Sequence, residues 1–135
     1  MDTVAIRNAV RRVVANAGGI DPAKEMMTSG NAFDPSGLAL WCVESVIGGD
    51  IFAVSNKCIG SNAYLLQYDF CVPASGDMDL AESKAYRVCS ALLNLDSLEV
   101  SGVDCYIRSA KVSSSMGTHF SSFSVLITLG IRGVS

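Results

Sequence analysis

Residues 63–72 show a two-residue alternation of side-chain character, and this feature constrains the fold more than any other in the chain. Successive side chains of an extended strand point to opposite faces of a sheet, so the alternation predicts a strand with one buried face. Gln67 and Asp69 fall on the opposite face, and Pro73 ends the run because proline has no amide to donate to a sheet ladder. The buried face is predicted to carry the apolar members Tyr64, Leu66, Tyr68, Phe70 and Val72.

Four other stretches have strand character, namely residues 38–46, 51–58, 98–115 and 123–131. The last of these has the cleanest alternation in the chain. In residues 98–115 the inward face changes partway, which predicts a β-bulge or a strong bend. Between the first two stretches, Gly48, Gly49 and Asp50 are predicted to form a hairpin turn.

Two stretches have the 3.6-residue periodicity of amphipathic helices. In residues 2–17 the apolar stripe is Ile6, Val10, Val13, Val14 and Ala17. In residues 79–94 it is Ala81, Ala85, Val88, Cys89 and Leu92. Gly18 and Gly19 are expected to end the first helix. Asp79 precedes Glu82 by the three residues of a capping box, so it is expected to start the second.

The remaining long segment, residues 20–37, is rich in turn-forming Gly, Pro, Asp and Asn and is expected to be a loop. It either contains a short turn of helix near residues 23–27 or serves as a mobile contact arm. The order helix, three strands, helix, two strands predicts one α+β domain over residues 1–135. Its mostly antiparallel sheet should have about five strands, with both helices packed on one face.

The composition argues for a folded protein with some of its apolar surface covered by a partner. Half of the residues are hydrophobic and 17% are charged, with a formal net charge of −3. This composition excludes a disordered chain, and the sequence lacks the basic stripe of a typical nucleic-acid binder. The one basic cluster is Arg7, Arg11 and Arg12. It is either a solvated helix face or a contact for an anionic partner, which could be a neighbouring subunit or a phosphate backbone.

No motif for catalysis, metal binding or cofactor binding occurs in the sequence, so we expect no enzyme activity and no cofactor. The five cysteines are widely spaced without a CxxC pair, and His119 is the sole histidine. The cysteines are therefore expected to be reduced core residues of a protein in a cytosol-like compartment. No apolar run reaches the length of about 18 residues that a membrane-spanning helix needs.

Two further patterns have alternative interpretations. Trp41, Tyr64, Tyr68 and the thiols are typical of core packing, but they could also line a pocket for a small ligand. The serine-rich residues 113–119, which include Ser114 and His119, are expected to form a polar connection. Such a connection is either a solvated turn or a loop that meets another subunit.

The order of these elements resembles that of the tail terminator or tail-completion proteins of long-tailed bacteriophages, including the group labelled minor capsid proteins. The resemblance rests on the aromatic alternation Tyr64-Leu-Leu-Gln-Tyr-Asp-Phe-Cys-Val72, the polar link 73–78, the helix 79–94 and a long closing hairpin over residues 100–131. It also includes the first helix. Other phage neck and head–tail connector proteins share this α+β plan.

The resemblance implies a structural role in the virion, after assembly in the host cytoplasm. Such proteins form a ring, usually a hexamer, that caps the tail tube and faces the connector of the head. The implied partners are therefore further copies of this chain, the tail tube protein and a neck protein, while DNA passes through the lumen without being read. On polarity and position, the candidate subunit contacts are Gly48, Gly49, Asp50, Ser114 and His119, together with the loop 20–37.

Overall fold

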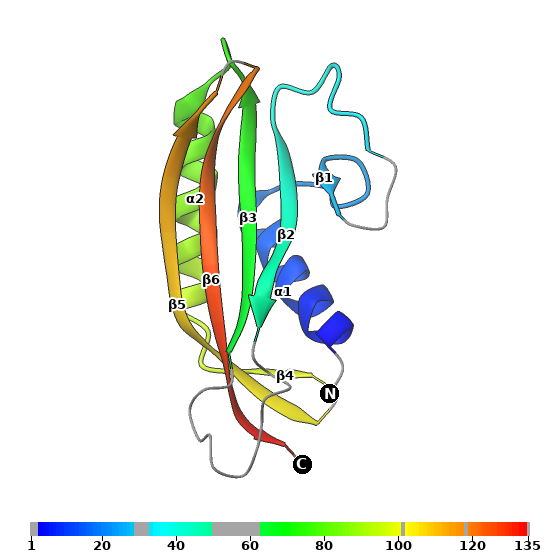
Figure 1. Cartoon of the computed structure of the whole chain (residues 1–135), viewed down its shortest axis with the longest axis vertical. Coiled ribbons are helices and arrows are strands. Elements are labelled where there is room, and N and C mark those ends of the chain that lie inside the picture. Colours follow the sequence, from blue (N-terminus) through cyan, green and yellow to red (C-terminus); the bar gives the residue numbers. More distant parts are fainter. Residues whose placement is uncertain (1–2, 29–32, 50–62, 101, 118, 135) are drawn as a thin grey trace.

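The computed structural model describes residues 3–28, 33–49, 63–100, 102–117 and 119–134. It has two layers, a sheet and a pair of helices that both lie behind the sheet in the view of Figure 1. The helices are α1 (Thr3–Gly18) and α2 (Met78–Leu93). The strands are β1 (Met26–Met27), β2 (Trp41–Gly49), β3 (Ala63–Pro73), β4 (Leu98–Val100), β5 (Val103–Met116) and β6 (Phe120–Val134).

The sheet has the strand order β1-β2-β3-β6-β5-β4. Every neighbouring pair is antiparallel except β1 with β2, so the predicted mostly antiparallel α+β fold with two helices is confirmed. The predicted strand 51–58 lies outside the described residues. Six strands occur in the described part instead of about five, because the sequence analysis did not separate β4 from β5 and missed β1.

Strand β1 corrects the prediction of a loop over residues 20–37, which allows for a short turn of helix but not for a strand. A turn after Asp21 carries the chain back to the sheet, where the amide of Cys42 donates to the carbonyl of Glu25 (2.8 Å). Met26 is fully buried and anchors the strand. Two residues are too few to produce a detectable alternation, so only the tertiary contact reveals this strand.

The predicted strand 98–115 is two strands joined by a tight turn. Gly102 has a positive φ of 78°, a backbone conformation that glycine adopts without steric cost, and it reverses the chain between β4 and β5. The predicted bulge is confirmed within β5, where the pairing with β6 shifts between Asp104 and Cys105 and again between Ile107 and Ser109.

Two predicted connections are instead parts of strands. Gly48 and Gly49 continue β2 and pair with Leu65 and Tyr64, with a shift in register just before them. Residues 113–115 lie within β5 opposite residues 122–124 of β6. The connection between these strands is therefore residues 117–119 and not the predicted 113–119. Long ladders explain both corrections, because cross-strand hydrogen bonds satisfy a backbone that glycine or serine propensity alone assigns to turns.

The core lies between the sheet and the helices, and both predicted apolar faces that define it are confirmed. All five inward residues of β3 and all five predicted residues of α2 are buried. On α1 the buried residues include Ile6, Val10 and Val14. The cap of α2 is Asp77 and not Asp79, because the Asp77 carboxylate accepts a hydrogen bond from the amide of Leu80 (3.2 Å).

Gly18 joins α1 to the rest of the core. A Cβ at this position would lie 3.2 Å from the ring of Phe70 and 3.4 Å from Val88, so glycine allows the end of α1 to approach both β3 and α2. The ammonium group of Lys84 on α2 donates to the carbonyl of Gly18, which satisfies one of the open carbonyls at the helix end.

Neighbouring leucines at the end of α2 test this arrangement. Leu92 is fully buried and Leu93 is 55% exposed. Leu92→Ala should lower the free energy of unfolding by about 2–5 kcal/mol, because it leaves a cavity in the core. Leu93→Ala is the matched control and should change it by about 0.5 kcal/mol or less. Urea denaturation measures both, and equal losses in the two variants would contradict the placement of α2.

Candidate functional site

The face of the sheet that points away from the helices, here called the open face, is a candidate interaction surface in the described part of the chain. Strand alternation places its residues opposite the buried side chains of β3. Three rows of paired residues from β2, β3, β6 and β5 form its centre. They are Trp41–Cys71–Ser122–Ser115, Val43–Asp69–Ser124–Ser113 and Ser45–Gln67–Leu126–Lys111.

Many side chains of the open face are small, and few are charged. Five of its twelve central residues are serines, and Asp69 and Lys111 are its two charged members. The amide of Gln67 donates to Asp69 Oδ1 (2.8 Å), which partly satisfies that carboxylate. Half-buried apolar residues such as Val43 and Leu126 lie among these groups. Such a surface suits contact with protein better than contact with a highly charged polymer.

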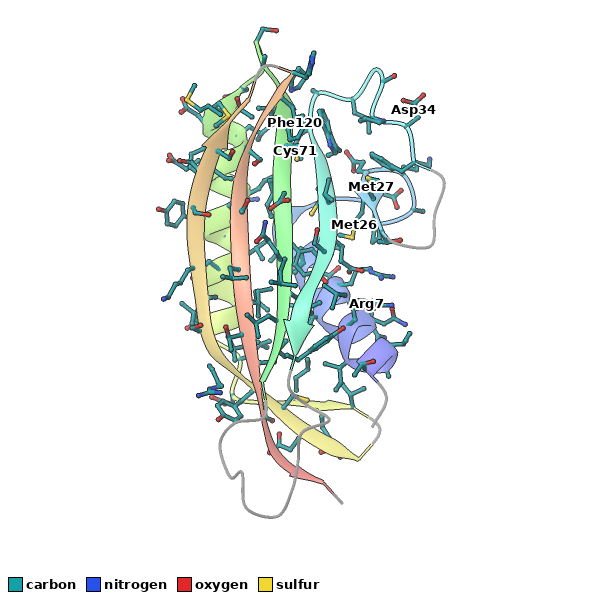
Figure 2. All side chains as sticks on the ribbon, viewed as in Figure 1. Arg7, Met26, Met27, Asp34, Cys71 and Phe120 are labelled. Carbon is teal, nitrogen blue, oxygen red and sulfur yellow. The ribbon has the colours of Figure 1, made fainter. Side chains whose placement is uncertain are left out.

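Aromatic residues mark the two ends of the open face. At one end the rings of Trp41 and Phe120 lie with centroids 6.2 Å apart at an interplanar angle of 60°. Figure 2 shows Phe120 close to Cys71 near the top of the sheet. At the other end Tyr106 covers Gly130, where a Cβ would lie 2.5 Å from the ring, so this position requires glycine.

Next to the aromatic pair, the end of the β5–β6 hairpin carries exposed apolar side chains. Met116 is 84% exposed and Phe120 is 48% exposed. Phe120 belongs to the open face, whereas Met116 alternates onto the helix side, so the hairpin tip carries exposed apolar side chains of both faces.

On the other side of the sheet, a buried carboxylate ties α1 to β2 and β3. The side chain of Glu44 is 2% exposed. Arg11 binds it through two hydrogen bonds, from Nε to Oε2 (2.8 Å) and from Nη2 to Oε1 (2.6 Å). The hydroxyl of Tyr68 donates to Oε2 (2.7 Å). This paired, hydrogen-bonded geometry is what allows an ionised carboxylate to remain inside a protein.

The three arginines of the predicted basic cluster therefore have different roles. Arg11 is hydrogen-bonded to Glu44. Arg7 lies at the edge of this cluster, with its Nε 3.6 Å from Glu44 Oε1. Arg12 is exposed. Figure 2 shows Arg7 projecting from α1 beside β2. The sequence analysis missed Glu44. An acidic residue inside a strand-like run and two arginines four residues apart on one helix were visible, but neither pattern specifies the other as its partner.

Burial changes the acid–base behaviour around this cluster. It raises the pKa of the Tyr68 hydroxyl, and the charge of Glu44 raises it further. Burial likewise raises the pKa of the Cys42 thiol, and that of Cys71 to about 12. The hydrogen bond to Glu44 raises the pKa of Arg11. The tyrosine and the thiols thus stay protonated near neutral pH, which disfavours their action as nucleophiles or metal ligands.

The remaining predicted site residues do not converge. Gly48 and Gly49 lie near one end of β2, whereas Ser114 and His119 lie near the hairpin tip at the opposite end of the sheet (Figure 1). Ser114 and His119 are exposed, and Asp50 lies outside the described residues. Trp41, Tyr64 and Tyr68 do not line a common pocket, because Tyr64 and Tyr68 are buried on the helix side and Trp41 belongs to the open face.

The described residues also bear on metal binding and on membrane insertion. They contain no group of three or more His, Cys, Asp or Glu side chains placed to hold a metal ion. Neither helix in the described part is long and apolar enough to cross a membrane. The four described cysteines, Cys42, Cys71, Cys89 and Cys105, are buried free thiols, and Cys58 lies outside the described residues.

Comparison with known proteins supports the fold. No protein-family model and no curated protein matches the chain. Among the solved chains that match is a structure with no descriptive functional name, which has a TM-score of 0.66 and 16% sequence identity. The match covers 100% of this chain and 99% of that one. At this identity the likeness shows a shared fold over the full length and carries no functional assignment.

The Glu44 cluster predicts an unequal response to neighbouring substitutions. Glu44→Ala should lower the free energy of unfolding by about 3–5 kcal/mol, because it leaves Arg11 and Tyr68 without their shared acceptor. Arg12→Ala removes an exposed arginine next to Arg11 in the sequence and should lower the free energy of unfolding by about 0.5 kcal/mol or less. Chemical denaturation compares the two variants. A Glu44→Ala protein as stable as Arg12→Ala would show that the cluster contributes nothing.

The raised pKa values predict a loss of stability at high pH. An unfolded cysteine loses its proton near its ordinary pKa of 9.0, while folded Cys71 keeps its proton to about 12. Folding therefore binds protons in this range, and the free energy of unfolding should fall as pH rises from about 9 towards 12. Cys71→Ser removes this thiol and should show a shallower decline in denaturation curves measured across that range. An unchanged slope would contradict the raised pKa.

Proposed function

We propose that this protein is a tail terminator of a long-tailed bacteriophage, a structural protein whose copies form a ring at the end of the tail tube. The ring stops growth of the tube and presents a surface to the neck of the head. This role requires surfaces that fit other protein subunits and requires no reaction. The proposal therefore depends on interfaces, and the open face is the observation that supports it most directly.

The open face supports a subunit role because the sheet has helices on one side alone among the described elements. A sheet normally buries its apolar face against a second layer. Here the open face is neither fully apolar nor strongly polar, since the half-buried Val43 and Leu126 lie among serines. A surface of this mixed character, with few charges, is typical of one that another protein covers.

The order of elements supports the choice of a terminator among assembly proteins. The resemblance to that family implied an aromatic alternating strand, a helix after a short polar link and a long closing hairpin. Strand β3, helix α2 and the β5–β6 hairpin follow this order. The exposed tip of the hairpin, with Met116 and Phe120, gives the subunit a projecting apolar end that suits contact with the tube or with the neck.

The assembly state and tube binding test the proposal. The purified protein should have a hexameric mass by multi-angle light scattering, and negative-stain images should show rings. Added during polymerisation of the tail tube protein, it should bind tube ends and shorten the tubes in proportion to its concentration. A protein that stays monomeric both alone and with tubes would refute this function, and binding to the head connector without binding to tubes would identify a different neck protein.

A further inference from the structure

Strand β5 has a long outer edge. On its inner side it pairs with β6 along its length, from Val103 to Met116. On its outer side β4 pairs with residues 103–105. In the part of the chain that the structure describes, residues 109–116 have no strand on that side. Backbone N–H and C=O groups along such an edge are a template for a further strand.

The opposite side of the sheet has a second edge. Strand β1 pairs with β2 at Cys42 and Val43, and β2 continues beyond it through residues 44–49. Among the described strands none adjoins this continuation on the outer side. Val46 and Ile47 are 46% and 51% exposed, and β2 contains no Pro, Lys or Arg. It therefore lacks proline and basic residues, two of the devices with which edge strands resist pairing, although it does have the inward-facing Glu44 and a register shift after Val46.

The two edges run in compatible directions. Each pair from β2 through β3 and β6 to β5 is antiparallel, so β5 runs opposite to β2. A ring related by rotation about an axis along the strands keeps every copy in the same orientation along that axis. In such a ring β5 of one copy meets β2 of the next in the antiparallel arrangement, and the helices of both copies stay on the same side of the sheet.

Charge favours this combination over pairing of β5 with itself. The edge segment of β5 carries the exposed Lys111, so two copies of this segment side by side would bring two lysines onto the same short ribbon. The cation-free β2 avoids this repulsion. Face parity adds a second match, because Ser113 and Ser45 both belong to the open face, while Val112 and Val46 both point to the helix side.

We propose that the outer edge of β5, at residues 109–116, pairs antiparallel with the outer edge of β2, at residues 44–49, of a second copy of this chain. The sheet then continues from subunit to subunit, with Ser113 opposite Ser45 and Val112 beside Val46. This inference rests on the ring proposed above and specifies the interface by which its subunits join. The interface is heterologous, since each copy uses two different edges.

Disulfide cross-linking tests the pairing with substitutions that scarcely alter side-chain size. The background variant is Cys58→Ser, because the four described cysteines are buried. Into it, Ser45→Cys and Ser113→Cys are introduced singly and together. Within one copy these positions are separated by three strand spacings, about 14 Å, which is too far for a disulfide. A control combines Ser113→Cys with Ser83→Cys on the exposed surface of α2.

Under mild oxidation the double variant Ser45→Cys/Ser113→Cys should give a ladder of covalent oligomers that ends at the subunit number measured by light scattering. Each single variant and the Ser83 control should give no ladder. A second combination, Ser45→Cys with Ser115→Cys, tests a register shifted by two residues on the same face. A ladder from either combination supports the edge pairing.

The other outcomes separate this inference from the proposed function. Rings that form without a ladder from either cysteine combination would overturn the edge pairing and leave the ring intact. Efficient dimers from Ser113→Cys alone would indicate pairing of β5 with itself and would also overturn it. A monomeric background protein, with correct circular dichroism, would overturn the ring and the edge pairing together.

Discussion

Burial of one face of β3 holds the two layers of this protein together. The five alternate residues from Tyr64 to Val72 are at most 5% exposed, and they face both helices across the core. Because β3 lies between β2 and β6 in the sheet, its inward residues also fix which side of each neighbouring strand is buried. A slip of one residue along β3 would exchange Phe70 and Tyr68 for Asp69 and Gln67, which no apolar core tolerates.

The Glu44 cluster adds direction to this non-directional burial. Apolar contact alone leaves a helix free to slide along a sheet, whereas the paired hydrogen bonds between Arg11 and Glu44 have a fixed geometry. Tyr68 joins the cluster from the same face of β3 that fills the core. The position of α1 is thereby linked to the register of β2 against β3. At the far end of the helix, Gly18 makes the matching close contact with Phe70.

The same architecture leaves one face and two edges of the sheet available in the described part of the chain. With both helices on one side, the open face keeps Ser113 and Ser115 exposed and Val43 and Leu126 half-buried. The outer edges of β2 and β5 extend past their short neighbours β1 and β4. These features place the candidate interaction surfaces on strands and not on loops. In the proposed ring, a subunit built in this way would present the same geometry to each neighbour, as repeated assembly requires.

The sequence by itself determined both helices, the inward faces of β3 and α2, and the mixed α+β class, because these depend on local periodicity that burial enforces residue by residue. Tertiary structure alone decided the features that depend on distant partners. Met26 joins the sheet because Cys42 is there to pair with it, and Gly48 and Gly49 stay extended because Leu65 and Tyr64 hold them. Arg11 binds Glu44, which lies 33 residues away in the sequence, and at this separation no local pattern specifies a contact. Local side-chain chemistry thus sets the elements, while long-range pairing of backbone and charge sets their neighbours and the sheet edges left uncovered among the described residues.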